Sequence, residues 1–196
     1  MRRLLSHGIV PPPPAPRQSR RAPHENAASI PFGLKGYLFH YAGGVVDERT
    51  GALDQLGKDL QAVNARFAAI GDEILALGNP TAVYSTAISK TEKDRPVEGA
   101  PAVPGGLAPL PPDHWFRVEG GELLVGLFKG PKGSDVLAAA CHNPYAPQTV
   151  TLRFGSPVKV SLFDRARKRW TPSQPVRNTI SFRVEEYATE LVRIER

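Results

Sequence analysis

The second half of the chain consists of short apolar runs separated by turn-forming residues, and this pattern restricts the possible folds most. Apolar and polar residues alternate within the runs, as in the stretch TVTLRF at 149–154. Such alternation is typical of strands with one buried face, and Gly, Pro and Asn occupy the breaks between them. The pattern predicts seven antiparallel strands that form a β-sandwich. The predicted strands are 114–118, 122–128, 135–142, 149–154, 158–164, 179–184 and 187–194.

One long amphipathic helix is predicted ahead of these strands. Large apolar residues recur at intervals of three or four over 53–77, which places them on one helical face. They are Leu53, Leu56, Leu60, Val63, Phe67, Ile70, Ile74 and Leu77. Gly78 and Pro80 end the helix. The flanking charges lack the regular pattern of a coiled coil, so we expect this face to pack on a sheet or on other helices. Apolar runs at 33–41 and 83–88 predict two short strands on either side of the helix.

Two proline-rich segments divide the chain. Residues 1–31 contain five arginines against a single glutamate, so they hold +4 of the formal net charge of +6. We expect this head to be disordered, because it has few large apolar residues to offset the entropy of ordering. Residues 95–112 are predicted to be a linker. The segments between and after them are then a strand–helix–strand unit at 32–94 and the sandwich at 113–196. The expected fold is α+β and mostly β: an antiparallel β-sandwich preceded by one long amphipathic helix and a short strand.

Residue types and spacing predict no catalytic residue, metal ion or cofactor. Cys141, the single cysteine, lies in an apolar run, and its neighbour His142 would point to the opposite strand face, so we expect a buried core thiol. The five histidines lack metal-ligand spacing, and no glycine-rich phosphate loop opens a helix. The acidic residues form no recognisable pair for glycoside hydrolysis. No run approaches the roughly 18 apolar residues of a membrane-spanning helix.

The order of the predicted elements resembles the end of a β-galactosidase-like glycoside hydrolase, a (β/α)8 barrel with an appended β-sandwich. The segment GLKGYLFHY at 33–41 resembles the last barrel strand, and the helix with its Leu-Gly end resembles the last barrel helix. The stretch LLVGLF at 123–128 resembles part of the C-terminal sandwich. The resemblance implies a substrate-binding role for His40 and Tyr41, which follow the strand near the sugar site of such enzymes.

The same resemblance places the catalytic acid and nucleophile on earlier barrel strands, which have no counterpart in this sequence. It therefore implies a remnant of a barrel end, a C-terminal fragment of a carbohydrate-active protein that does not hydrolyse glycosides by itself. The partners that it implies are carbohydrate and a missing barrel domain or another protein chain. An unpartnered strand and helix would expose apolar surface, so we expect the isolated chain to bind hydrophobic dyes and to aggregate.

Two other functions stay open at the level of sequence. A free-standing β-sandwich that binds a glycan or a protein would present exposed aromatic residues in a planar patch, with Trp115 and Trp170 as candidates. A basic nucleic-acid adaptor would use the head and the cluster RARKR at 165–169. This third function is the least favoured, because such a cluster between two strands is ordinarily a solvated hairpin turn, and the head has no aromatic residue to stack on bases.

Overall fold

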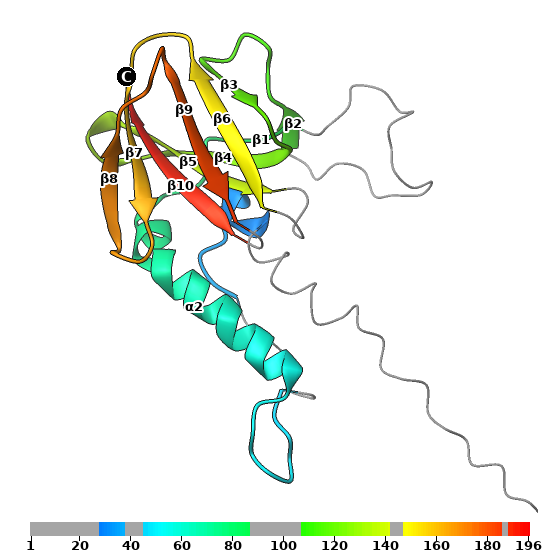
Figure 1. Ribbon diagram of the computed structural model, residues 1–196. Helices are drawn as coiled ribbons and strands as arrows, with labels where there is room; N and C mark the ends of the chain where they lie inside the picture. Colours follow the sequence, from blue (N-terminus) through cyan, green and yellow to red (C-terminus); the bar gives the residue numbers. More distant parts are fainter. Residues whose placement is uncertain (1–27, 38–44, 87–106, 142–146, 186–187) are drawn as a thin grey trace, which may run out of the picture.

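The described part of the protein is mostly β, with one long helix and two sheets (Figure 1). The structure is a computed structural model, and it describes residues 28–37, 45–86, 107–141, 147–185 and 188–196. His40 and Tyr41 lie outside this part of the chain, as do the first 27 residues.

The larger sheet has seven strands in the order β2-β1-β4-β5-β10-β7-β8. Its strands are antiparallel except for β1 and β2, which are parallel. Prolines lie in both outermost strands of the described sheet, Pro109 in β2 and Pro172 in β8. The bounds are β1 Ala82–Ser85, β2 Leu107–Pro109, β4 Leu123–Lys129, β5 Asp135–Cys141, β7 Lys159–Asp164, β8 Arg169–Ser173 and β10 Thr189–Glu195.

The smaller sheet has three antiparallel strands in the order β3-β6-β9, with bounds β3 Phe116–Glu119, β6 Gln148–Phe154 and β9 Thr179–Val184. Alternate residues of each strand are buried or partly buried, as in Val150, Leu152 and Phe154 of β6. The predicted inward and outward faces of 149–154 are therefore confirmed. The buried faces of both sheets contribute to one apolar core, which includes Phe116 of β3, Val125 of β4 and Val192 of β10.

A second core lies on the opposite face of the larger sheet, against helix α2, Gln55–Ala76. Ile70 and Ile74 of the helix pack there with Phe128 and Leu191 of the sheet. Figure 1 shows α2 running away from the sheets, with its C-terminal end beside β7 and β8. The Asp54 carboxylate accepts a hydrogen bond from the Gly57 amide at 2.9 Å and caps the N-terminus of the helix.

The predicted helix over 53–77 is confirmed to within two residues at its start and one at its end. However, the expectation that its apolar face lacks a partner is wrong. Ile70, Ile74 and Leu77 are buried against the larger sheet, and Leu60 and Val63 are buried as well. The larger sheet therefore covers the C-terminal part of the apolar face of the helix within this chain.

A short 3-10 helix, η1 at Ile30–Phe32, also lies on this face of the larger sheet. Ile30 is only 3% exposed, and a Cβ atom on Gly126 of β4 would lie 2.2 Å from the carbonyl oxygen of Pro31. The glycine thus allows η1 to contact the strand backbone directly. Since Ile30 and Pro31 are packed in this way, the predicted boundary of a disordered head at residue 31 is wrong.

Three other sequence predictions need correction. The predicted strand at 33–41 is not a strand over its described part, because 33 is a turn and 34–37 have no regular structure. The predicted linker at 95–112 ends in β2, which pairs with β1. Strand β8 was not predicted, because Pro172 and Pro175 suggest a break. Its position at the end of the sheet explains the difference, since a proline is tolerated in an edge strand.

Candidate functional site

The two tryptophans lie on different layers of the molecule, so the prediction of one planar patch is wrong. Trp115 packs against the core between the sheets, and Trp170 packs against the core under α2. A guanidinium group covers each indole ring, that of Arg196 at 4.6 Å from the Trp115 ring centre and that of Arg193 at 3.9 Å from the Trp170 ring centre.

Trp170 is part of a polar contact between the helix and the larger sheet. Its ring packs edge-on against Phe163, and its Nε1 is buried without a hydrogen-bond partner in the described part of the chain. Arg193, which lies over this ring, also approaches Glu73 of α2 at 3.7 Å. These contacts indicate that Trp170 fixes the helix on the sheet and does not present a binding surface.

Trp115, in contrast, lines a surface groove of about 350 Å³ beside β3. We call it the arginine groove, and its lining residues are Asp113, His114, Trp115, Arg117, Arg153, Phe154 and Gly155. Backbone hydrogen bonds hold its walls. The His114 amide donates to the Pro111 carbonyl at 3.2 Å, and the Gly155 amide donates to the Trp115 carbonyl at 3.0 Å. The groove therefore lies where the turn before β3 meets the end of β6.

Two arginines on the outer face of the smaller sheet contribute the charge of this groove. Arg117 of β3 and Arg153 of β6 are directly opposite each other in the strand register, and both are exposed. Arg153 forms an ion pair with Glu119 at 2.9 Å. Arg117 has no ion-pair partner within the described part of the chain.

His114 forms an inner wall of the groove. Its ring packs edge-on against Phe116 at 4.6 Å and Tyr84 at 5.2 Å between ring centres. Burial lowers the pKa of His114, and the nearby positive charge of Arg196 lowers it further. We therefore expect a neutral imidazole at pH 7, with no charge that would repel a cation or hold an anion.

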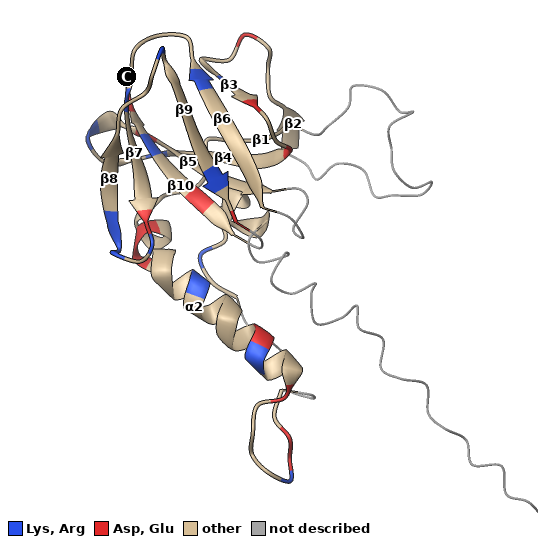
Figure 2. Cartoon of the chain, viewed as in Figure 1, with Lys and Arg blue, Asp and Glu red and all other residues tan. Residues whose placement is uncertain are grey.

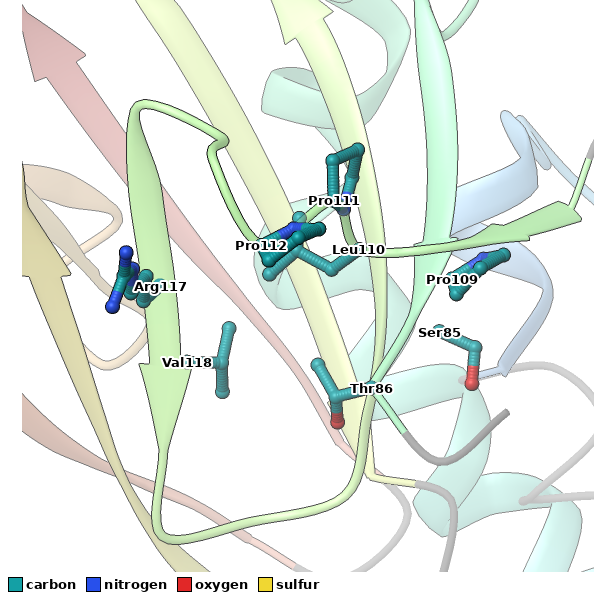
Figure 3. A pocket seen from close by; sticks show the side chains of 8 residues that line it. All are labelled: Ser85, Thr86, Pro109, Leu110, Pro111, Pro112, Arg117 and Val118. Atoms are coloured by element: carbon teal, nitrogen blue, oxygen red, sulfur yellow. The ribbon is translucent and has the colours of Figure 1, made fainter. Parts of the chain in front are cut away.

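A second groove, of about 370 Å³, lies on the other side of β3, and three of its eight lining residues are prolines. Figure 3 shows Val118 and Thr86 approaching each other across it, with Leu110, Pro111 and Pro112 along one wall. The Thr86 hydroxyl is already engaged, since it donates to the Gly121 carbonyl at 3.2 Å and accepts from the Leu123 amide at 2.8 Å. This groove therefore offers few free polar groups to a ligand.

The thiol of Cys141 is buried at 5% exposure in the core between the sheets, as predicted. Burial raises the pKa of this thiol, which disfavours the nucleophilic thiolate. Among the described residues, no group of three or more His, Cys, Asp or Glu side chains is arranged to hold a metal ion.

The basic cluster at 165–169 begins with a turn between β7 and β8, as predicted, but it is only partly solvated. Arg165 forms an ion pair with Glu190 at 2.9 Å and donates a hydrogen bond to the Thr189 carbonyl oxygen. Arg167 pairs with Asp164 at 2.9 Å. In Figure 2 acidic and basic residues are interspersed along the described elements. Two of the four cationic side chains in this cluster are thus engaged within the protein.

The outward orientation of Arg117 and Arg153 had a signal in the sequence. Each arginine stands between two apolar residues, in FRV at 116–118 and in LRF at 152–154, so alternation places both on an exposed face. No sequence signal indicated that the two arginines lie opposite each other, because this depends on how β3 pairs with β6.

Comparison of the chain with protein-family models, curated proteins and solved structures finds no match. Within the described residues, the single long helix is not apolar enough to cross a membrane.

Proposed function

We propose that this chain is a non-catalytic β-sandwich module of a carbohydrate-active, glycoside-hydrolase-like protein and that it contacts carbohydrate through the arginine groove. The lining of this groove carries the proposal: the half-buried Trp115, which packs on the buried Phe154, lies beside a carboxylate and two guanidinium groups. Aromatic walls favour the apolar faces of sugar rings, and a few fixed polar groups orient a bound ligand.

The sandwich part of this proposal rests on the shared core. Fully buried residues of β4, β5 and β10 in the larger sheet and of β3, β6 and β9 in the smaller sheet belong to one apolar cluster. This shared cluster supports the proposal that the two sheets form a sandwich, because the sheets of a sandwich pack through their buried faces.

The non-catalytic part rests on the carboxylates. Most glycoside hydrolases use two carboxyl groups around the scissile bond, whereas Asp113 is the single carboxylate among the residues that line the arginine groove. Asp135, which is largely buried, is paired with Lys129 at 2.7 Å and with Arg196 at 2.8 Å. Hydrolysis would then belong to a catalytic domain, in the same chain or in another one.

The barrel part of the resemblance has weaker support than the sandwich part. The segment 33–37 has no strand, and α2 packs against the larger sheet of this chain. The proposal is therefore that the chain is an accessory module that contacts carbohydrate. It does not require that the segment at 33–41 form a barrel strand.

Affinity electrophoresis of the full chain in gels that contain polysaccharides tests this function. We expect slower migration in at least one of galactan, xylan and polygalacturonate than in a plain gel. Trp115→Ala should abolish the retardation, because it removes one wall of the groove. Trp170→Ala is the matched control, since the same type of residue is lost on the opposite side of the larger sheet.

Circular dichroism of both variants shows whether the fold is retained, and Asp113→Asn provides a conservative change of the groove if Trp115→Ala does not fold. Unchanged migration in every gel would contradict the proposal, as would equal losses in the Trp115 and Trp170 variants. Release of reducing sugar by the chain alone would contradict its non-catalytic part.

A further inference from the structure

The outer face of the smaller sheet holds two like charges in direct opposition. Arg117 and Arg153 are cross-strand partners on β3 and β6, and the residues on either side of each point into the core. Side chains that are directly opposite in an antiparallel pair have Cβ atoms about 4.5–5.5 Å apart, and like charges in such positions destabilise the sheet. An anion between the two guanidinium groups would remove this repulsion.

Of the two arginines, Arg153 has a neighbouring carboxylate as an ion-pair partner, whereas Arg117 has none among the described residues. Glu119 is two residues from Arg117 on the same strand face, yet its carboxylate pairs with Arg153, at 2.9 Å from Nε. On the same face, Arg183 of β9 is also compensated, by Glu185 at 2.8 Å. Arg117 differs from both, because it lacks an ion-pair partner within the described residues and lines both surface grooves.

The groove beside Arg117 combines this charge with an apolar wall. Trp115 and Phe154 have ring planes 17° apart, with centres 6.3 Å apart, and they border the groove next to the two arginines. A planar guanidinium group forms two parallel hydrogen bonds to a carboxylate or a sulfate. Phe154 is buried beneath the groove, so the accessible part of the half-buried Trp115 ring provides the surface for an adjacent sugar ring. Asp113, on the same lining, is an acceptor for sugar hydroxyl groups.

We propose that the arginine groove binds an acidic sugar, whose carboxylate or sulfate group lies between Arg117 and Arg153. This inference rests on the proposed function and names the class of carbohydrate. Uronic acids and sulfated sugars share the required anionic group, and the experiment below distinguishes them. A nucleic acid would supply phosphate groups instead, but nucleic-acid binding ordinarily draws on several basic side chains along the phosphate backbone. Among the described residues that line the groove, Arg117 is the one cation without an ion-pair partner.

Affinity electrophoresis of the full chain with four probes tests this inference at low ionic strength, where screening is weak. The probes are polygalacturonate for carboxylates, dextran sulfate for sulfates, dextran for neutral sugars, and single-stranded DNA for phosphates. We expect tighter binding to one or both acidic polysaccharides than to dextran or DNA. Stronger retardation by polygalacturonate than by dextran sulfate identifies a uronate, and the reverse order identifies a sulfated sugar.

Arg117→Gln should weaken binding of the favoured acidic polysaccharide about tenfold, because charge-assisted hydrogen bonds are lost. Arg183→Gln is the matched control, since it removes one positive charge from the same sheet face outside the groove. It should change affinity less than about twofold. Arg153→Gln is a second groove variant, with an expected loss in the same direction. Both groove side chains are exposed, and thermal unfolding confirms that each variant is folded.

Equal losses in the Arg117 and Arg183 variants would overturn the inference, because they would indicate non-specific attraction to net charge. Binding of dextran as tight as that of both acidic probes, unaffected by Arg117→Gln, would overturn the acidic class and leave the proposed carbohydrate function intact. Tightest binding to DNA, lost in Arg117→Gln, would replace the sugar with a phosphate ligand. Failure to bind any polysaccharide, neutral or acidic, would overturn the proposed function itself.

Discussion

The two faces of the larger sheet are covered in different ways. Towards the smaller sheet the contact is largely apolar, and several of its large side chains are 1% exposed or less, among them Phe116, Leu123, Leu137 and Val192. Towards α2 there is also an apolar centre, but polar groups lie at its margin. Lys35 donates hydrogen bonds from Nζ to the carbonyl oxygens of Ile74, at 2.6 Å, and Gly78, at 3.0 Å, where the helix ends.

This difference indicates that the two contacts contribute to stability differently. The core between the sheets gains its stability from apolar burial, which has no directional requirement. The helix depends in addition on directed contacts at its C-terminal end, where a lysine ammonium group also interacts favourably with the helix dipole. We therefore expect the sheets to unfold together and α2 to be separable from them.

The largest expected effect is a loss in the core between the sheets. Phe116→Ala removes a fully buried ring and should lower the free energy of unfolding by about 3–5 kcal/mol. Urea unfolding followed by circular dichroism measures it. Ile74→Ala, at 2% exposure in the helix contact, is the comparison, with an expected loss of about 2–4 kcal/mol. The helical signal should then be lost at lower urea than the strand signal, and coincident transitions in Ile74→Ala would show that the two contacts form one cooperative unit.

A smaller effect should separate η1 from the larger sheet. Gly126→Ala places a Cβ atom 2.2 Å from the Pro31 carbonyl oxygen, so η1 must move, at a cost of about 1–3 kcal/mol. Gly71→Ala is the control, because no atom lies within 4 Å of its added Cβ and it is inside a helix. It should stabilise the protein by about 0.5–1 kcal/mol. Thermal unfolding of both variants distinguishes the signs, and equal shifts would show that η1 does not restrict Gly126.

A still smaller effect is expected for the polar margin of the helix contact. Arg193→Ala removes the cation–π contact with Trp170 and the approach to Glu73, with an expected loss of about 1 kcal/mol. Arg193→Lys keeps the charge but loses the planar stack, so it should fall between the alanine variant and the wild type. Arg183→Ala, on the exposed face of β9, should have less than about half this effect. Equal losses for positions 193 and 183 would contradict a specific role for Trp170.

The smallest effect concerns pH and two carboxyl groups with opposite shifts. Burial raises the pKa of Glu190 above its ordinary value of 4.5, although Arg165 partly opposes this rise. The folded state then binds more protons at this site than the unfolded state, so its contribution to stability decreases as the pH rises from about 4.5 through the raised pKa. Glu190→Gln should remove this decrease, which urea unfolding over a series of pH values measures.

Asp164 provides the control of opposite sign. Hydrogen bonds from the Arg167 amide and side chain lower the pKa of Asp164 below 3.8. Its contribution is therefore present above pH 3.8 and is lost as the pH falls through the lowered pKa. Asp164→Asn should lower the free energy of unfolding at neutral pH. It should also reduce the dependence of this free energy on pH below about 3.8. The same slope change in both variants would contradict the assignment of these shifts.

The sequence predicted the elements with a strong internal period and missed those that depend on tertiary contacts. The three-and-four spacing over 53–77 located α2, and alternation located most strands of the second half. The aromatic run at 33–41 was predicted to be a strand, but its described part is not one. An apolar composition without a clear period is compatible with several conformations. Strands β2 and β8 were missed since their prolines are compatible with a strand only at the edge of a sheet, and no local pattern shows where an edge lies.

The candidate site was less accessible to sequence reasoning than the fold. Trp115 was identified as a possible contact residue, and it lines the arginine groove, whereas Trp170 does not. The opposition of Arg117 and Arg153 depends on the pairing of residues that are 36 positions apart. Alternation fixes the face on which each arginine lies but not the strand beside it, and strand pairing is decided by the packing of the whole core.

The prolines in β2 and β8 also bear on how copies of this protein behave at high concentration. An unprotected outer strand presents a row of free amide and carbonyl groups on which a strand of another molecule can add, the first step of fibril growth. Within the described residues, Pro109 removes an amide donor from one outer strand of the larger sheet and Pro172 removes one from the other, and these strands have three and five residues. The sheet is therefore poorly suited as a template for such polymerisation.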